Sequence, residues 1–152
     1  MALSTFETYR QGILGLPMSS IWRGHGSAIF LELGQLHPVR RRDGSSGSLT
    51  GDYTVMLEWS WRIENRTSIL GGSWSDEEGW DTLFKSLMGQ TVQDISVFGR
   101  LPELSLALSG EKYVVSFMTA EGQPAWSILR RTGSDDQSPS LSVADGKIVA
   151  DQ

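Results

Sequence analysis

The chain has 152 residues and a formal net charge of −5, from 13 Lys and Arg against 18 Asp and Glu. It contains no Cys, which excludes thiol nucleophiles, thiolate zinc sites and a disulfide framework. The length predicts a single globular domain over 1–152, and 39% hydrophobic residues with six Trp provide material for its core. Because no apolar run approaches the ~20 residues of a membrane span and residues 1–11 lack a signal-peptide pattern, we expect a cytoplasmic protein without a membrane partner.

Two helices are predicted, the first over Phe6–Leu14 and the second beginning at Ser75. Residues 75–78 read Ser-Asp-Glu-Glu, the pattern of a capping box in which Ser75 and Glu78 satisfy each other's backbone N–H groups. The apolar residues that follow recur at helical spacing, and Gly89 supplies a left-handed stop. They are Trp80, Leu83, Phe84, Leu87 and Met88.

Strand patterns fill most of the remaining chain. Tyr53–Glu64 alternates strictly, with Trp59 and Trp61 on its apolar face, and this predicts one continuous strand with one buried side. Short turns such as Ser109-Gly110-Glu111 and Asp145-Gly146 favour antiparallel pairing between neighbours. Further strands are expected over 28–33, 95–98, 104–108, 113–118 and 125–130, with a last hairpin over 141–149.

The apolar spacing repeats along the chain with an offset of 74 residues, and of 75 after the next turn. Leu14, Met18 and Ile21 correspond in this way to Met88, Val92 and Ile95. This predicts an internal repeat, 5–74 and 79–150, although generic α+β patterning is an alternative explanation. The predicted fold is α+β, two tandem pseudo-symmetric helix-plus-antiparallel-meander units packed around a Trp-rich core. Gly/Ser-rich residues 43–52 and residues 132–140 are predicted to form flexible loops.

Four runs of the sequence resemble those of small uncharacterised bacterial proteins, domains of unknown function. The runs are YTVMLEWSWRIE at 53–64, GSWSD at 72–76, GRLPEL at 99–104 and SFMTAEG at 116–122. The resemblance covers residues 10–131 and implies a bacterial, cytosolic, stand-alone domain. It implies no activity, cofactor or catalytic residue.

Few residues suggest chemistry. The carboxylates of Asp76, Glu77, Glu78 and Asp81 could act in acid–base or metal chemistry, but acidic residues in a helix's first turn are stabilised by the helix dipole. Neither His25 nor His37 has a second histidine at the sequence spacing of a metal site. A turn histidine that faces solvent is the simpler interpretation. Arg40–Arg42 lacks interleaved aromatic residues. We therefore assign no catalytic residue, metal or cofactor, and expect no nucleic-acid partner.

The tryptophans are the most informative functional residues. They can simply fill a core, or some can form a binding surface, since Trp and Arg are enriched in interface hot spots. We expect a ligand or partner surface that includes Trp22, Arg23, His25, Trp59, Trp61, Trp74 and Trp126. The predicted function is a non-enzymatic bacterial binding or protein-interaction module, such as an immunity or adaptor protein. Alternatives are a small-ligand-binding domain with a Trp-lined cavity, and an enzyme using His25 or the carboxylates of residues 76–81.

Overall fold

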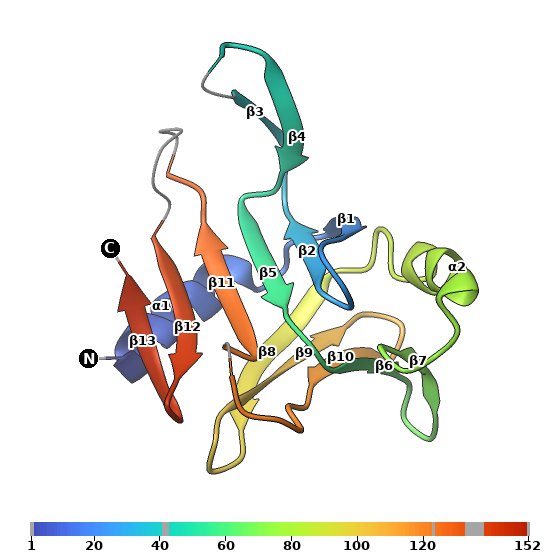
Figure 1. Cartoon of the computed structure of the whole chain (residues 1–152). Helices are drawn as coiled ribbons and strands as arrows, with labels where there is room; N and C mark the ends of the chain where they lie inside the picture. The colour runs from blue at the N-terminus through green and yellow to red at the C-terminus, as the bar shows by residue number, and fades with distance from the viewer. Residues whose placement is uncertain (1, 41–42, 123, 133–138, 152) are drawn as a thin grey trace.

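The computed structural model describes residues 2–40, 43–122, 124–132 and 139–151 (Figure 1). This part of the chain forms an α+β fold that is mostly strand, and it contains no helix long and apolar enough to cross a membrane. The helical elements are α1 (Ala2–Ile13), the short 3-10 helix η1 (Glu77–Gly79) and α2 (Trp80–Lys85). The strands are β1 (Met18–Arg23), β2 (Ile29–Leu33), β3 (His37–Arg40), β4 (Ser46–Thr50), β5 (Tyr53–Leu57), β6 (Trp61–Glu64), β7 (Ile69–Gly72), β8 (Val92–Phe98), β9 (Glu103–Leu108), β10 (Lys112–Ser116), β11 (Trp126–Arg130), β12 (Ser140–Ala144) and β13 (Lys147–Asp151).

The strands form two main antiparallel sheets and a separate hairpin. One sheet has the order β1-β2-β5-β11-β12-β13, and the other has the order β7-β6-β10-β9-β8. Each sheet therefore combines strands from the first and second halves of the chain. The hairpin β3–β4 extends away from both sheets at the top of Figure 1. It occupies much of the segment 43–52 that the sequence predicts to be a flexible loop, whereas residues 133–138 of the other predicted loop lie outside the described ranges.

The chain crosses between the two sheets after β5 and again after β10. The prediction of one continuous strand over 53–64 is wrong, because β5 ends at Leu57 in one sheet and β6 begins at Trp61 in the other. The two crossing segments bond to each other. The Glu58 N–H donates to the Ala125 carbonyl at 3.0 Å, and the Phe117 N–H donates to the Ser60 carbonyl at 3.1 Å.

A second connection between the sheets, here named the central link, joins residues 15–18 to residues 89–92. An isolated antiparallel bridge pairs Pro17 with Thr91. Backbone hydrogen bonds on both sides of the bridge fix the start of β1 against the start of β8. They run from Gly15 N–H to Val92 O (2.8 Å), from Val92 N–H to Leu16 O (2.9 Å), from Met18 N–H to Gln90 O (2.7 Å) and from Gly89 N–H to Met18 O (2.9 Å).

One hydrophobic core cluster includes side chains of both sheets and both helices. Three of the six tryptophans, Trp61, Trp80 and Trp126, lie within it. Trp61 makes a T-shaped contact with Trp80, with ring centroids 5.0 Å apart, and Trp126 makes one with Phe6 at 6.5 Å. A buried Trp cluster in an α+β fold is therefore confirmed. Alternation also assigned buried faces correctly in β9, where Leu104, Leu106 and Leu108 are all buried.

The start of the second helix differs from the predicted capping box. The Ser75 hydroxyl accepts a hydrogen bond from the N–H of Gly72, the last residue of β7, and does not cap the helix. Asp76 is the capping residue, because its carboxylate accepts from the Glu78 N–H at 3.1 Å. Because the Ser75 hydroxyl is bonded to Gly72, the next residue, Asp76, is the N-cap. The helical segment therefore begins with the 3-10 helix η1, which precedes α2.

Candidate functional site

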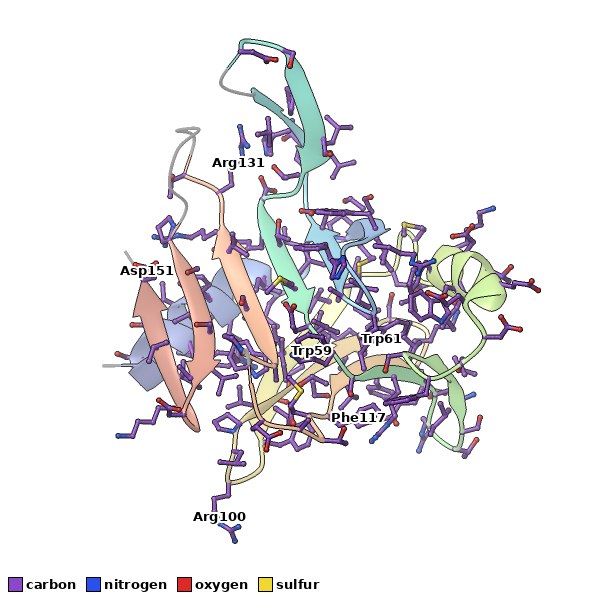
Figure 2. All side chains as sticks on the ribbon, viewed as in Figure 1. Trp59, Trp61, Arg100, Phe117, Arg131 and Asp151 are labelled. Atoms are coloured by element: carbon purple, nitrogen blue, oxygen red, sulfur yellow. The ribbon has the colours of Figure 1, made fainter. Side chains whose placement is uncertain are left out.

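Trp59 and Trp74 line one groove on the surface, with a volume of about 370 Å³. The Trp74 side chain is 83% exposed and that of Trp59 is 46% exposed, values far above those of the tryptophans in the core. Trp59 lies where the chain leaves β5, as its label in Figure 2 shows. The residues that line the groove are Ser27, Trp59, Ser60, Trp74, Met118, Thr119, Ala120 and Glu121.

Hydrogen bonds fix the backbone on which both exposed indoles are carried. The Ser27 hydroxyl, in the β1–β2 turn, donates to the Trp59 carbonyl at 2.5 Å. Next to Trp74, the Ser73 N–H donates to the Trp61 carbonyl at 2.9 Å, and the Ser73 hydroxyl accepts from the Trp61 N–H at 3.1 Å. The groove is therefore built on a pinned backbone, which reduces the conformational entropy that a bound partner must remove.

Trp61 and Trp126, both expected at the ligand or partner surface, are fully buried and present no side-chain surface to a partner. Each anchors a turn instead. The Trp61 Nε1–H donates to the Ser27 carbonyl at 2.7 Å, and the Trp126 Nε1–H donates to the Pro102 carbonyl at 3.0 Å. Their role is to satisfy turn carbonyls from inside the core. Trp61 thus fixes one wall residue of the groove, Ser27, by a hydrogen bond from the core.

Trp22 is 37% exposed on β1, but its indole is engaged. The ring stacks on Phe30 with centroids 3.9 Å apart, and its Nε1–H donates to the Glu32 carboxylate at 2.7 Å. Glu32 is fully buried and also accepts from the Gly51 N–H at 2.9 Å and the Thr54 hydroxyl at 2.5 Å. Trp22 therefore helps to satisfy the hydrogen-bonding capacity of a buried carboxyl group, which would otherwise be strongly unfavourable to bury.

Arg23 and His25 do not line the groove. The Arg23 guanidinium lies over the Trp80 ring, 4.4 Å from its centroid, and forms an ion pair with Glu77. This contact ties the end of β1 to η1. His25 is exposed on the same β1–β2 turn that supplies Ser27.

The carboxylates proposed as catalytic candidates are used in part to build the fold. Asp76 caps η1 and Glu77 pairs with Arg23. Within the described ranges no group of three or more His, Asp and Glu side chains is placed to hold a metal ion.

A pairing between His37 and Asp52 was not predicted from the sequence. His37 Nε2 lies 2.7 Å from one Asp52 carboxylate oxygen, and the other oxygen accepts from the Gln35 N–H at 2.9 Å. Burial raises the pKa of Asp52, but the hydrogen bonds with His37 and Gln35 lower it more, so the net shift is downward. His37 begins β3 and Asp52 follows β4, so recognising the β3–β4 hairpin was the signal that could have found the pair.

A larger hollow of about 780 Å³ lies between α2 and the turns that follow β6 and β9. Its charged side chains already have partners in the chain. Arg66 pairs with Glu111 at 3.3 Å, and the Lys112 ammonium donates to the Ser86 carbonyl at 2.9 Å. The groove of Trp59 and Trp74 offers larger exposed aromatic surface, so it is the better candidate site.

No protein-family model, curated protein or solved structure matches this chain. The function therefore has to be inferred from the geometry of the chain itself.

Proposed function

We propose that the chain is a non-enzymatic protein-interaction module that binds another protein through the groove of Trp59 and Trp74. The observation that carries this proposal is that two exposed indoles line the same groove on a hydrogen-bonded backbone. Trp is the residue most typical of interface hot spots. We propose that this interaction serves an immunity or adaptor role in a bacterial cytoplasm.

The energy available at this groove is sufficient for a hot spot. A Trp side chain presents roughly 200 Å² of surface, of which Trp74 leaves 83% exposed. Covering that surface at about 25 cal/mol per Å² contributes about 4 kcal/mol before the entropy of association is subtracted. The loss of binding free energy on truncation of Trp74 should therefore be among the largest seen for single interface substitutions.

The test compares Trp74→Ala with Leu49→Ala, a truncation of another exposed apolar residue, which lies on β4 and does not line the groove. Proteins recovered from the source cells with the wild-type chain are purified, and their binding is measured by calorimetry. We expect Trp74→Ala to raise the Kd at least about thirtyfold and Leu49→Ala to leave it within about twofold. An unchanged Kd in both Trp74→Ala and Trp59→Ala would refute the proposal.

A small organic ligand in the same groove is the second candidate. Its volume of about 370 Å³ is within the range of ligand sites, roughly 300–1,000 Å³. This version differs from the predicted interior cavity, because the groove is on the surface and the tryptophans of the core pack against other rings. Saturable quenching of Trp59 and Trp74 fluorescence by a purified metabolite fraction, lost in Trp74→Ala, would favour it over a protein partner.

We also propose that the two halves of the chain are copies of one helix-plus-meander unit whose later strands are exchanged between the two sheets. The central link supports this: a shift of 74 residues carries the Gly15-to-Val92 hydrogen bond onto the Gly89-to-Met18 hydrogen bond. The other two hydrogen bonds of the link obey the same shift. The exchange is consistent with the sheet orders, in which β6 and β7 pair beside β10 while β11 to β13 continue from β5.

The buried tryptophans support the same relation. Trp61 bonds to Ser27 in the β1–β2 turn, and Trp126 bonds to Pro102 in the β8–β9 turn, which is 75 residues further along. Each of these tryptophans begins the strand that has crossed into the other sheet. Matched substitutions of Trp61 and Trp126 by Phe test this proposal.

A further inference from the structure

The groove of Trp59 and Trp74 is acidic as well as aromatic. Glu121 is the one charged residue among those that line it, and Glu121 makes no ion pair within the described ranges. Two more carboxylates without an ion pair in the described ranges, those of Asp76 and Glu78, lie two and four residues after Trp74. The whole chain carries a net charge of −5. A partner that enters this groove meets indole faces and uncompensated negative charge.

No Lys or Arg of the described residues lines the groove, and the two arginines closest in sequence to its lining residues have other partners. Arg23 is held by Glu77 and by the Trp80 ring. Arg62 is held by Glu64 at 2.9 Å and lies over the Phe117 ring at 5.4 Å. Each of these two guanidinium groups therefore already has a carboxylate and an aromatic ring as partners.

A further carboxylate, that of Glu103, contacts the segment after β10 without lining the groove. Glu103 accepts hydrogen bonds from the Ser116 hydroxyl at 2.7 Å and from the Met118 N–H at 2.5 Å. These bonds fix the start of the segment that carries Met118 and Glu121 into the groove. Neither donor is cationic, so the carboxylate of Glu103 adds to the negative potential behind Met118.

We propose that the groove receives a lysine or arginine side chain from a basic, extended segment of the partner protein. This rests on the proposed function and specifies the chemistry of the partner. A cation over an indole face is attracted by the ring quadrupole, and Trp is the most effective side chain for this contact. Met118 and the indoles cover the aliphatic stem, while Glu121 faces the charged end.

The test uses two synthetic peptides, a Gly/Ser peptide with three lysines and the same peptide with norleucine in place of each lysine. Norleucine keeps the stem and removes the charge. Binding to the full chain is followed by the NMR shifts of the indole Nε1–H groups of Trp59 and Trp74. We expect the lysine peptide to shift both signals saturably, the norleucine peptide to bind at least about tenfold more weakly, and added salt to weaken the lysine peptide.

Two variants and a matched control locate the interaction. Trp74→Ala should weaken the lysine peptide about tenfold, and Glu121→Gln about two- to fivefold. Asp151→Asn likewise removes one carboxylate charge, on the edge strand β13 of the six-stranded sheet and outside the groove. It should have no effect on peptide binding. Equal affinity for the two peptides, no binding of either peptide, or binding that Trp74→Ala leaves intact would each overturn this inference. If an isolated partner still depends on Trp74 in those cases, the interaction function stands and only the cationic occupant is wrong.

Discussion

Replacement of Trp61 by Phe tests the link between the core and the groove. Trp61 is fully buried, and its Nε1–H donates to the Ser27 carbonyl at 2.7 Å. Phe retains one six-membered ring but removes three ring atoms, one of which is the Nε1 donor. The missing volume of roughly 40 Å³ costs about 1 kcal/mol as a cavity, and the lost transfer energy of the ring atoms costs about 1 kcal/mol. Leaving the Ser27 carbonyl without its donor costs about 1 kcal/mol more. We therefore expect Trp61→Phe to lower the free energy of unfolding by about 2–3 kcal/mol.

Trp126→Phe is the matched variant. It removes the same atoms from an equally buried site and releases the Pro102 carbonyl in place of that of Ser27. If the two positions are copies, urea unfolding followed by far-UV circular dichroism should give losses that agree within about 0.5 kcal/mol, with unchanged m values. Only Trp61→Phe should also move the Trp59 indole signal, because Ser27 holds the Trp59 carbonyl. A loss below about 1 kcal/mol, or a Trp59 signal that responds equally in both variants, would refute the reasoning.

Three other variants test separate contacts. Tyr9→Phe removes a buried hydroxyl that has no hydrogen-bond partner in the described structure. The free energy of unfolding should stay the same or rise by up to about 1 kcal/mol, and the thermal midpoint should stay the same or rise with it. A clear fall in the thermal midpoint would contradict this. Gly51→Ala should cost about 2–4 kcal/mol in urea unfolding, because its Cβ would lie 2.7 Å from the Leu33 nitrogen and closer still to the Leu33 carbonyl oxygen, whereas Gly79→Ala, whose Cβ meets nothing within 4 Å, should cost little. Asp52 has a pKa below its usual value, so its contribution to stability is present above the unfolded carboxyl pKa of about 3.9 and is lost as the pH falls through the lower folded value. Asp52→Asn should remove that part of the acid sensitivity in unfolding measured from pH 6 to pH 2, and an unchanged pH profile would contradict it.

Local patterns identified most elements and failed where distant strands decide the path of the chain. The turn at Asp145-Gly146 follows the rule that such pairs adopt positive φ, since both residues do. The alternation over 53–64 continues through the crossing, because β5 before it and β6 after it both bury every second residue. Alternation reports the face of a residue and not its pairing partner, so it placed Trp59 with Trp61 in the interior. The break at 58–60 depends on β10 and β11, which lie more than fifty residues further along.

The candidate site was predictable only in part for the same reason. Trp74 and Trp59 were named from the sequence, yet nothing in their spacing distinguishes them from the buried Trp61 and Trp126. Exposure depends on which indoles the crossing segments leave uncovered. Met118 and Glu121 were missed because they enter the groove only through the fold of residues 117–121 beside Glu103.

The double crossing also sets an order for synthesis on the ribosome. The five-stranded sheet uses only β6 to β10, so all its strands are available once β10 has emerged. The strand β5 emerges earlier but pairs on one side with β11, which is made later. Throughout that interval one edge of β5 has unpaired backbone groups beside the apolar side chains of Val55 and Leu57. A nascent chain paused between β10 and β11 is therefore the form of this protein most exposed to chaperones and to aggregation.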